Sequence, residues 1–100
     1  MDIVKTDIKP LKTFRILVSG RVQGVGFRYF AHDRAVEFMV NGYVQNTRDN
    51  KVEIICQGQK KNLDMFIVSI KKGPALSFIS EFILEEIADF SLYDFFDIKH

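Results

Sequence analysis

The hydrophobic pattern of this chain changes its period in a definite order, and that order constrains the fold more than any other feature. Residues 13–19 alternate between inward and outward positions, so that Phe14, Ile16 and Val18 would share one face of a strand. Over Phe27–Val40 the apolar residues instead recur about every 3.6 positions, which predicts an amphipathic helix. A strand therefore leads directly into a helix, and the loop between them is rich in glycine.

The same succession is then repeated. We expect the first helix to stop at Asn41-Gly42, because glycine takes the left-handed conformation at little cost. Two strands flanking a turn follow, then an amphipathic helix with apolar residues at i, i+3, i+4 and i+7, and then two further strands. The ranges are Tyr43–Thr47 and Lys51–Gln57 for the hairpin, Leu63–Ile70 for the apolar face of the helix that Gly73-Pro74 ends, Phe78–Ile87 for the next strand and Asp94–His100 for a short terminal one.

This order predicts an α+β fold of the ferredoxin-like type, with the pattern βαββαβ and a short extra strand at the carboxyl end. We expect one antiparallel sheet with both helices on one face. The length of 100 residues suggests one domain, which we place at residues 13–100. Residues 1–12, which contain Pro10, are expected to form a flexible leader.

Composition excludes several classes of protein. The formal net charge of +1 and the scattered Lys and Arg residues do not suit a nucleic-acid binder. Cys56 is the only cysteine, so no intramolecular disulfide can form, and we expect a reducing, cytoplasmic location. It should pack with Val52 and Ile54 as a small apolar side chain. The chain shows no signal-peptide or membrane-spanning pattern, and two histidines give no metal-binding cluster, so we expect no metal and no cofactor.

The stretch GRVQGVGFR, residues 20–28, has the makings of an anion site. Glycines allow successive backbone N–H groups to point into one concavity, and a helix N-terminus adds unpaired donors and a partial positive charge. Arg28 in the first turn opposes the helix dipole by about 0.3–1 kcal/mol, a cost that a bound anion would reverse. On spacing alone, an outward-pointing Arg28 beside a simple glycine turn is the slightly favoured interpretation.

Two motifs make the sequence resemble the acylphosphatases. Gly20–Arg28 match the family pattern G-x-V-Q-G-V-x-[FY]-R, and Gly42–Asn46, GYVQN, match G-[WY]-V-x-N, with Gly58 at the expected place. The resemblance extends over residues 13–100. It implies the ferredoxin-like fold, hydrolysis of the carboxyl–phosphate bond of acyl phosphates, and no metal or cofactor. It places the catalytic residues at Arg28 and Asn46 and the backbone phosphate cradle at Val22, Gln23, Gly24, Val25, Gly26 and Phe27.

The chemistry suits these residue types. Phosphoryl transfer depends largely on positioning and electrostatic stabilisation, so Arg28 and the loop amides would hold the phosphate. The amide of Asn46 would orient the attacking water. The implied partners are a small-molecule acyl phosphate and inorganic phosphate, as product and inhibitor, with no nucleic acid and no membrane. We expect a monomer.

Two alternatives and one departure from the family remain. The same loop could serve a non-catalytic, anion-binding regulatory domain. An RNA-binding ferredoxin-like module is a weaker alternative, because its aromatic signature belongs on the third strand, and KVEIICQ has no aromatic residue. Where the family commonly ends in F-x-I-R-Y, this chain has Lys99 and His100. If the tail braces the site, we expect Lys99 to do so as a point charge.

Overall fold

The structure is a computed structural model that describes residues 11–88 and 91–100. The elements follow the predicted order, and the α+β ferredoxin-like fold is confirmed. Lys12, predicted to lie in the leader, instead begins the first strand, and residues 1–10 of that leader lie outside the described residues. The elements are β1 Lys12–Arg21, α1 Phe27–Phe38, β2 Asn41–Asn46, β3 Val52–Gly58, α2 Lys60–Lys72, β4 Phe78–Glu86 and β5 Phe96–Lys99.

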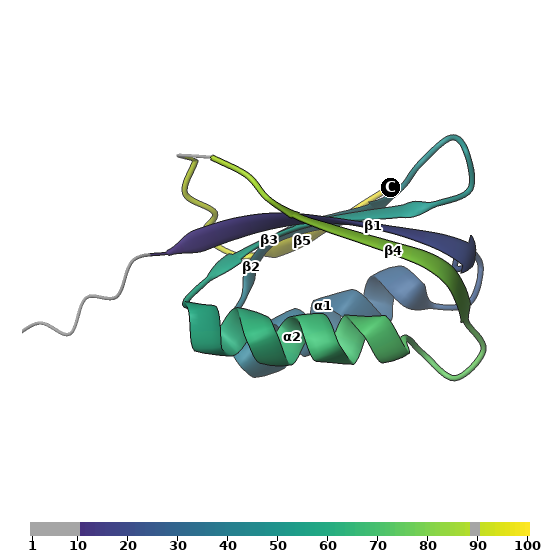
Figure 1. Cartoon of the computed structure of the whole chain (residues 1–100), viewed down its shortest axis with the longest axis horizontal. Helices are drawn as coiled ribbons and strands as arrows, with labels where there is room; N and C mark the ends of the chain where they lie inside the picture. Colours follow the sequence, from purple (N-terminus) through teal and green to yellow (C-terminus); the bar gives the residue numbers. More distant parts are fainter. Residues whose placement is uncertain (1–10, 89–90) are drawn as a thin grey trace, which may run out of the picture.

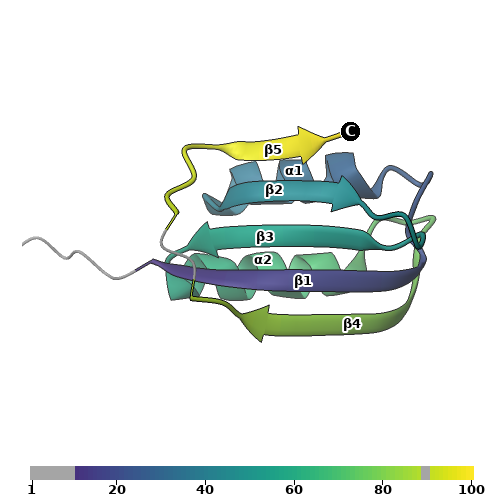
Figure 2. The same ribbon diagram turned by 90° about the horizontal axis from the view of Figure 1, so that it is seen from above.

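The strands form one sheet in the order β4-β1-β3-β2-β5 (Figure 2). Pairing is antiparallel except at one edge, where β5 lies parallel to β2. The four main strands are thus antiparallel as predicted, and the extra strand at the carboxyl end, for which the sequence predicted no direction, pairs parallel to β2. The physical reason is that β4 ends at the end of the sheet where β2 begins. The chain crosses that end and enters β5 in the direction of β2.

Side-chain hydrogen bonds attach this crossing to the end of the sheet. The Gln57 amide donates to the carbonyl of Ser91 at 2.7 Å, and the backbone N–H of Tyr93 donates back to Gln57 Oε1 at 3.1 Å. Asn41 Nδ2 donates to the carbonyl of Tyr93 at 2.8 Å. Because the crossing is held at both β3 and β2, the start of β5 is fixed beside β2.

Both helices cover the same face of the sheet, as predicted (Figure 1). Ile16 and Val18 are fully buried on that face, and Phe14 packs against them partly buried, so the predicted alternation of β1 is confirmed. Cys56 is buried in the same core, in agreement with its predicted packing role. From α1 the core receives Phe27, Ala31 and Ala35, and from α2 it receives Leu63, Phe66 and Ile70. Neither of these two helices is long and apolar enough to cross a bilayer.

The end of α1 differs from the prediction. The helix stops at Phe38, and Met39 takes the left-handed conformation with φ 58° and ψ 47°. The N–H of Val40 then donates to the carbonyl of Ala35 at 2.8 Å, the 6→1 bond of a Schellman ending. Gly42 instead lies within β2 at φ 140°, where a Cβ would collide with the carbonyl oxygen of Ile55. The glycine is thus needed for close strand pairing and not for stopping the helix.

Strand direction decides what meets at the far end of the sheet. β1 and β2 are both antiparallel to β3, and β5 is parallel to β2, so β1, β2 and β5 all run the same way. Their carboxyl ends therefore lie at one end of the sheet, and α1 begins there. The glycine loop, the end of β2 and the end of β5 are brought together although they are far apart in sequence (Figure 2). Asn46 is the last residue of β2.

Candidate active site

The loop between β1 and α1 exposes backbone donors. Gly24 and Gly26 have φ values of 71° and 79°, in the left-handed region, and a Cβ at either would meet nothing within 4 Å. Glycine is required there for its backbone conformation and not for space. Gly26 is the N-cap of α1, which has no side-chain cap and no acidic residue in its first turn. The first amides of the helix are therefore available to an anion.

Gln23 ties this loop to the β2–β3 turn. Its Nε2 donates to the carbonyl of Thr47 at 3.0 Å and to that of Lys51 at 2.8 Å. Thr47 also closes the turn, because its backbone N–H donates to the Lys51 carbonyl at 2.9 Å. The sequence predicted only a backbone role for Gln23. Its side chain proves to join the loop to the residues directly after Asn46.

Arg28 and Asn46 line the same hollow, which has a volume of about 180 Å³. Asn46 lies at the end of β2 on the face of Val44, the helix side, because side chains alternate along a strand. Tyr29, which the sequence reasoning missed, also lines the hollow although the residue is 59% exposed. Of the six predicted cradle residues, Gln23 and Val25 do not line it, and the four that do are Val22, Gly24, Gly26 and Phe27.

The last residue of β5, Lys99, and the following residue, His100, contact Arg28. Arg28 Nη1 donates to the backbone carbonyl of Lys99 at 3.0 Å and lies 3.3 Å from His100 Nδ1. The Lys99 ammonium lies on the opposite face of the sheet, 3.8 Å from the centre of the Tyr43 ring. The expectation that Lys99 would brace the site as a point charge was therefore wrong. Side chains alternate along β5, and the backbone of Lys99 makes the contact instead.

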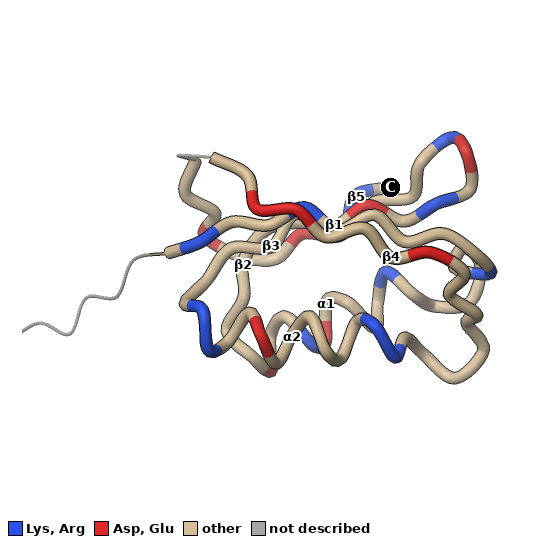
Figure 3. Tube along the Cα trace, viewed as in Figure 1, with Lys and Arg blue, Asp and Glu red and all other residues tan. Residues whose placement is uncertain are grey.

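Charge elsewhere on the molecule is balanced. Figure 3 shows Lys and Arg interspersed with Asp and Glu over both layers, with no single basic face. On the face of the sheet away from the helices, Arg15 Nε lies 2.6 Å from a carboxylate oxygen of Glu53, and its Nη1 lies 3.3 Å from Glu85. Burial raises the pKa of Glu53, but the hydrogen bonds from Arg15 and Gln45 together with the positive charges of Arg15 and Lys99 outweigh it and hold that pKa below its ordinary value.

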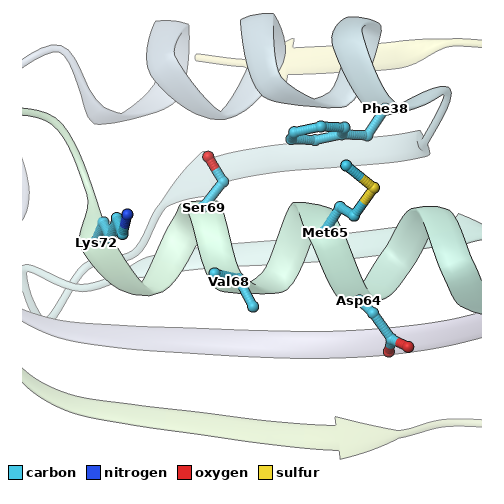
Figure 4. A pocket seen from close by; sticks show the side chains of 6 residues that line it. All are labelled: Phe38, Asp64, Met65, Val68, Ser69 and Lys72. Carbon is cyan, nitrogen blue, oxygen red and sulfur yellow. The ribbon is translucent and has the colours of Figure 1, made fainter.

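A larger hollow, of about 430 Å³, lies between the two helices and shares no lining residue with the hollow at the glycine loop (Figure 4). Its walls are mainly Phe38, Met65 and Val68. Its lining also includes Lys72 and Asp64, and no residue from the first turn of either helix. In the described part of the chain, residues 11–88 and 91–100, no group of three His, Cys, Asp or Glu side chains is arranged to hold a metal ion.

Both the sequence and the structure of this chain are similar to those of known proteins. Residues 14–98 match the family model described as Acylphosphatase. A curated acylphosphatase of Bacillus pumilus is 35% identical over 86 residues, which are 86% of this chain and 96% of that protein. The crystal structure of acylphosphatase from Bacillus subtilis superimposes with a TM-score of 0.85 at 35% identity, over 91% of this chain and all of that one. Full-length HypF, in its phosphate- and nucleotide-bound form, matches with a TM-score of 0.85 at 29% identity, over 96% of this chain and 13% of HypF.

Proposed function

The chain belongs to the acylphosphatase family, and from this premise we propose how its residues hydrolyse the carboxyl–phosphate bond of an acyl phosphate. The products are a carboxylate and inorganic phosphate. The observation that carries the proposal is the shared hollow, because Arg28, Asn46 and the glycine loop all line it. The positions of these groups in the sequence would not by themselves indicate that they lie together.

Arg28 and the loop amides bind the phosphoryl group. The backbone N–H groups of the loop residues that line the hollow and the uncapped start of α1 supply donors, and the guanidinium supplies a full positive charge. A dianion in the hollow removes the unfavourable interaction between Arg28 and the helix dipole. It is held between two sources of positive potential, which also stabilise the charge that develops on the phosphoryl oxygens in the transition state.

Asn46 orients the attacking water. Its carboxamide has an acceptor oxygen and two N–H donors, so it can hold a water molecule in line with the scissile bond. The water oxygen bonds to phosphorus, and the phosphorus–oxygen bond to the acyl group breaks. The carboxylate leaves with the electron pair.

The proton of the water passes to an oxygen of the substrate's own phosphate. The described residues lining the hollow include no carboxylate and no imidazole that could accept it. An acyl phosphate already carries a good leaving group, so the reaction needs no protonation of the departing carboxylate. The role of the protein is to position the water and to neutralise charge.

The two other candidate functions are less well supported. Family membership and the match of whole acylphosphatase chains favour the enzyme over a regulatory anion sensor. An RNA-binding module needs aromatic side chains on the exposed face of the sheet. At its centre this face carries the ion pair of Arg15 with Glu53, and β3 has no aromatic residue.

The proposed function also leads to expectations about inhibition, cellular location and oligomeric state. We expect inorganic phosphate to inhibit competitively, since the product fits the site that holds the substrate's phosphoryl group. A buried free thiol at Cys56 is compatible with a reducing compartment, and we place the enzyme in the cytoplasm as a monomer. Size-exclusion chromatography with light scattering tests the monomer directly.

The deciding experiment is an assay of acetyl phosphate or benzoyl phosphate hydrolysis after treatment of the protein with a chelator. We expect Arg28→Ala to lose both phosphate affinity and turnover, whereas Asn46→Ala loses turnover and still binds inorganic phosphate. Arg34→Ala on the same helix and Asn62→Ala on α2 are matched controls that lie outside the hollow. Full activity of Asn46→Ala would remove that residue from the mechanism, and a chelated wild-type protein without turnover would favour the anion sensor.

A further inference from the structure

We propose that Tyr29 is a specificity-determining residue, whose ring packs against the acyl group of the substrate and favours an aromatic acyl group over a small one such as acetyl. The proposal rests on the function given above, in which Arg28 and the loop amides hold the phosphoryl group. It assigns the other half of the substrate, which departs as a carboxylate, to a side chain of α1.

The hollow offers one side chain with an apolar surface that a ligand can reach. Two of its lining residues are glycines, and Arg28 and Asn46 are polar. Val22 and Phe27 are only 1% and 2% exposed because both pack into the core, so neither presents a surface to a substrate. Tyr29 is 59% exposed. Among the described residues at the hollow, its ring is therefore the large apolar surface open to a bound molecule.

Helix geometry directs this ring away from the sheet and back toward the glycine loop. Phe27, Ala31 and Ala35 are buried and mark the face of α1 that packs on the sheet. At 3.6 residues per turn, Tyr29 follows Phe27 by about 200° around the helix, so it lies on the outer face. Side chains of a helix lean toward its N-terminus. Because Tyr29 is in the first turn of α1, its ring extends toward the loop that binds the phosphoryl group.

Asn46 and Tyr29 flank the place of the phosphoryl group from opposite sides. Asn46 lies at the end of β2 on the face that the helices cover, whereas Tyr29 lies on the side of α1 away from the sheet. The attacking and leaving oxygens of a phosphoryl transfer are roughly in line. A water molecule held by Asn46 attacks from the side of the sheet, so the acyl oxygen departs on the side of Tyr29.

The chemistry of an acyl phosphate makes the ring selective. A single bridging oxygen separates phosphorus from the acyl carbon, so the substituent of that carbon lies next to Tyr29. A planar aromatic acyl group can stack on the ring or meet it edge to face, which contributes binding free energy beyond the apolar area that is buried. The methyl group of acetyl phosphate covers little of the ring, and inorganic phosphate has no acyl group at all.

Two variants of Tyr29 test the proposal. Tyr29→Ala removes the ring, and Tyr29→Phe keeps the ring and loses only the hydroxyl. For Tyr29→Ala we expect the ratio of kcat/KM for benzoyl phosphate to kcat/KM for acetyl phosphate to fall about three- to tenfold, the scale of one aromatic pair. Tyr29→Phe should keep the wild-type ratio. Val36→Ala is the matched control, because Val36 is exposed on the same helix and lies outside the hollow.

Inorganic phosphate is the second probe, and its inhibition constant should change less than about twofold in Tyr29→Ala, since phosphate does not reach the ring. Thermal unfolding of this variant should agree with that of the wild type, because the ring is mostly exposed. An unchanged or raised ratio would overturn the proposal, and so would a Tyr29→Phe variant as defective as Tyr29→Ala. The proposed function fails if the wild type hydrolyses neither acyl phosphate, whereas full wild-type turnover with an unchanged ratio in Tyr29→Ala refutes this inference alone.

Discussion

The hydrogen bonds of Gln23 offer the sharpest test of how the site is held together. In Gln23→Ala the carbonyl of Thr47 loses the donor at 3.0 Å, and that of Lys51 loses the donor at 2.8 Å. The Lys51 carbonyl keeps the N–H of Thr47 at 2.9 Å. A half-buried hydrogen bond contributes about 0.5–1.5 kcal/mol net, so the variant should be less stable by about 1–2 kcal/mol. For a domain of this size that corresponds to a fall in Tm of roughly 4–16 °C.

The effect on catalysis should exceed the effect on binding. Asn46 immediately precedes Thr47, so a turn released from the loop no longer holds the carboxamide in line with the phosphate. A displacement on the order of 1 Å at a reacting group costs about 100-fold in rate. We therefore expect kcat for benzoyl phosphate to fall by about 10- to 100-fold. The inhibition constant of phosphate should change far less, since the loop amides and Arg28 remain.

Gln45→Ala is the matched control for this experiment. Gln45 belongs to the same β2 strand, and its Nε2 donates to Glu53 at 2.7 Å on the opposite face of the sheet. It should lose a similar amount of stability by urea unfolding while keeping kcat. If both glutamine variants lower kcat equally, loss of stability explains the defect and the tie between loop and turn has no catalytic role. An unchanged kcat in Gln23→Ala would refute the reasoning outright.

Two further predictions concern the loop and the sheet. Gly26→Ala places a Cβ on a residue at φ 79°, so we expect the variant to be less stable by about 1 kcal/mol and to bind phosphate more weakly. Urea unfolding measures the stability, and isothermal titration measures the phosphate affinity. An unaltered phosphate affinity would count against the loop amides as ligands. Because the pKa of Glu53 is lowered by Arg15 and Gln45, its carboxylate contributes stability at pH 7 that is lost as the pH falls below about 4.5 and through the folded-state pKa. The difference in unfolding free energy between wild type and Glu53→Gln should accordingly shrink from pH 7 to pH 3. A difference that stays constant over this range would show that the ion pair does not determine the pH dependence of stability.

Much of the fold could be predicted because it depends on local pattern. The burial of Ile16 and Val18, of Leu63 and Phe66, and of Cys56 follows from apolar residues at strand and helix spacing. The errors arose where a residue has two possible uses. Gly42 suits a helix stop by its conformational freedom, but the close approach of Ile55 across the sheet determines its use, and Met39 ends the helix instead.

The candidate site was predicted in a different way. Arg28 and Asn46 were identified through a family resemblance, because the sequence pattern alone favoured a solvent-exposed arginine and a turn asparagine. Nothing local to Gln23 indicated that its side chain would reach Thr47 and Lys51. The tail was misjudged because side-chain chemistry was considered for Lys99, whereas the contact to Arg28 comes from its carbonyl.

The sequence by itself determined the elements of this protein, their order, the faces they bury and the loop whose glycines expose backbone donors. These properties depend on neighbours within a few residues, so they can be read from short segments of the sequence. Only the tertiary structure decided that Arg28 meets Lys99 and His100, 71 and 72 positions away, and that Asn46 shares its hollow. Those contacts follow from β1, β2 and β5 running in one direction, and strand direction is set by pairing between segments distant in sequence, which no local pattern records.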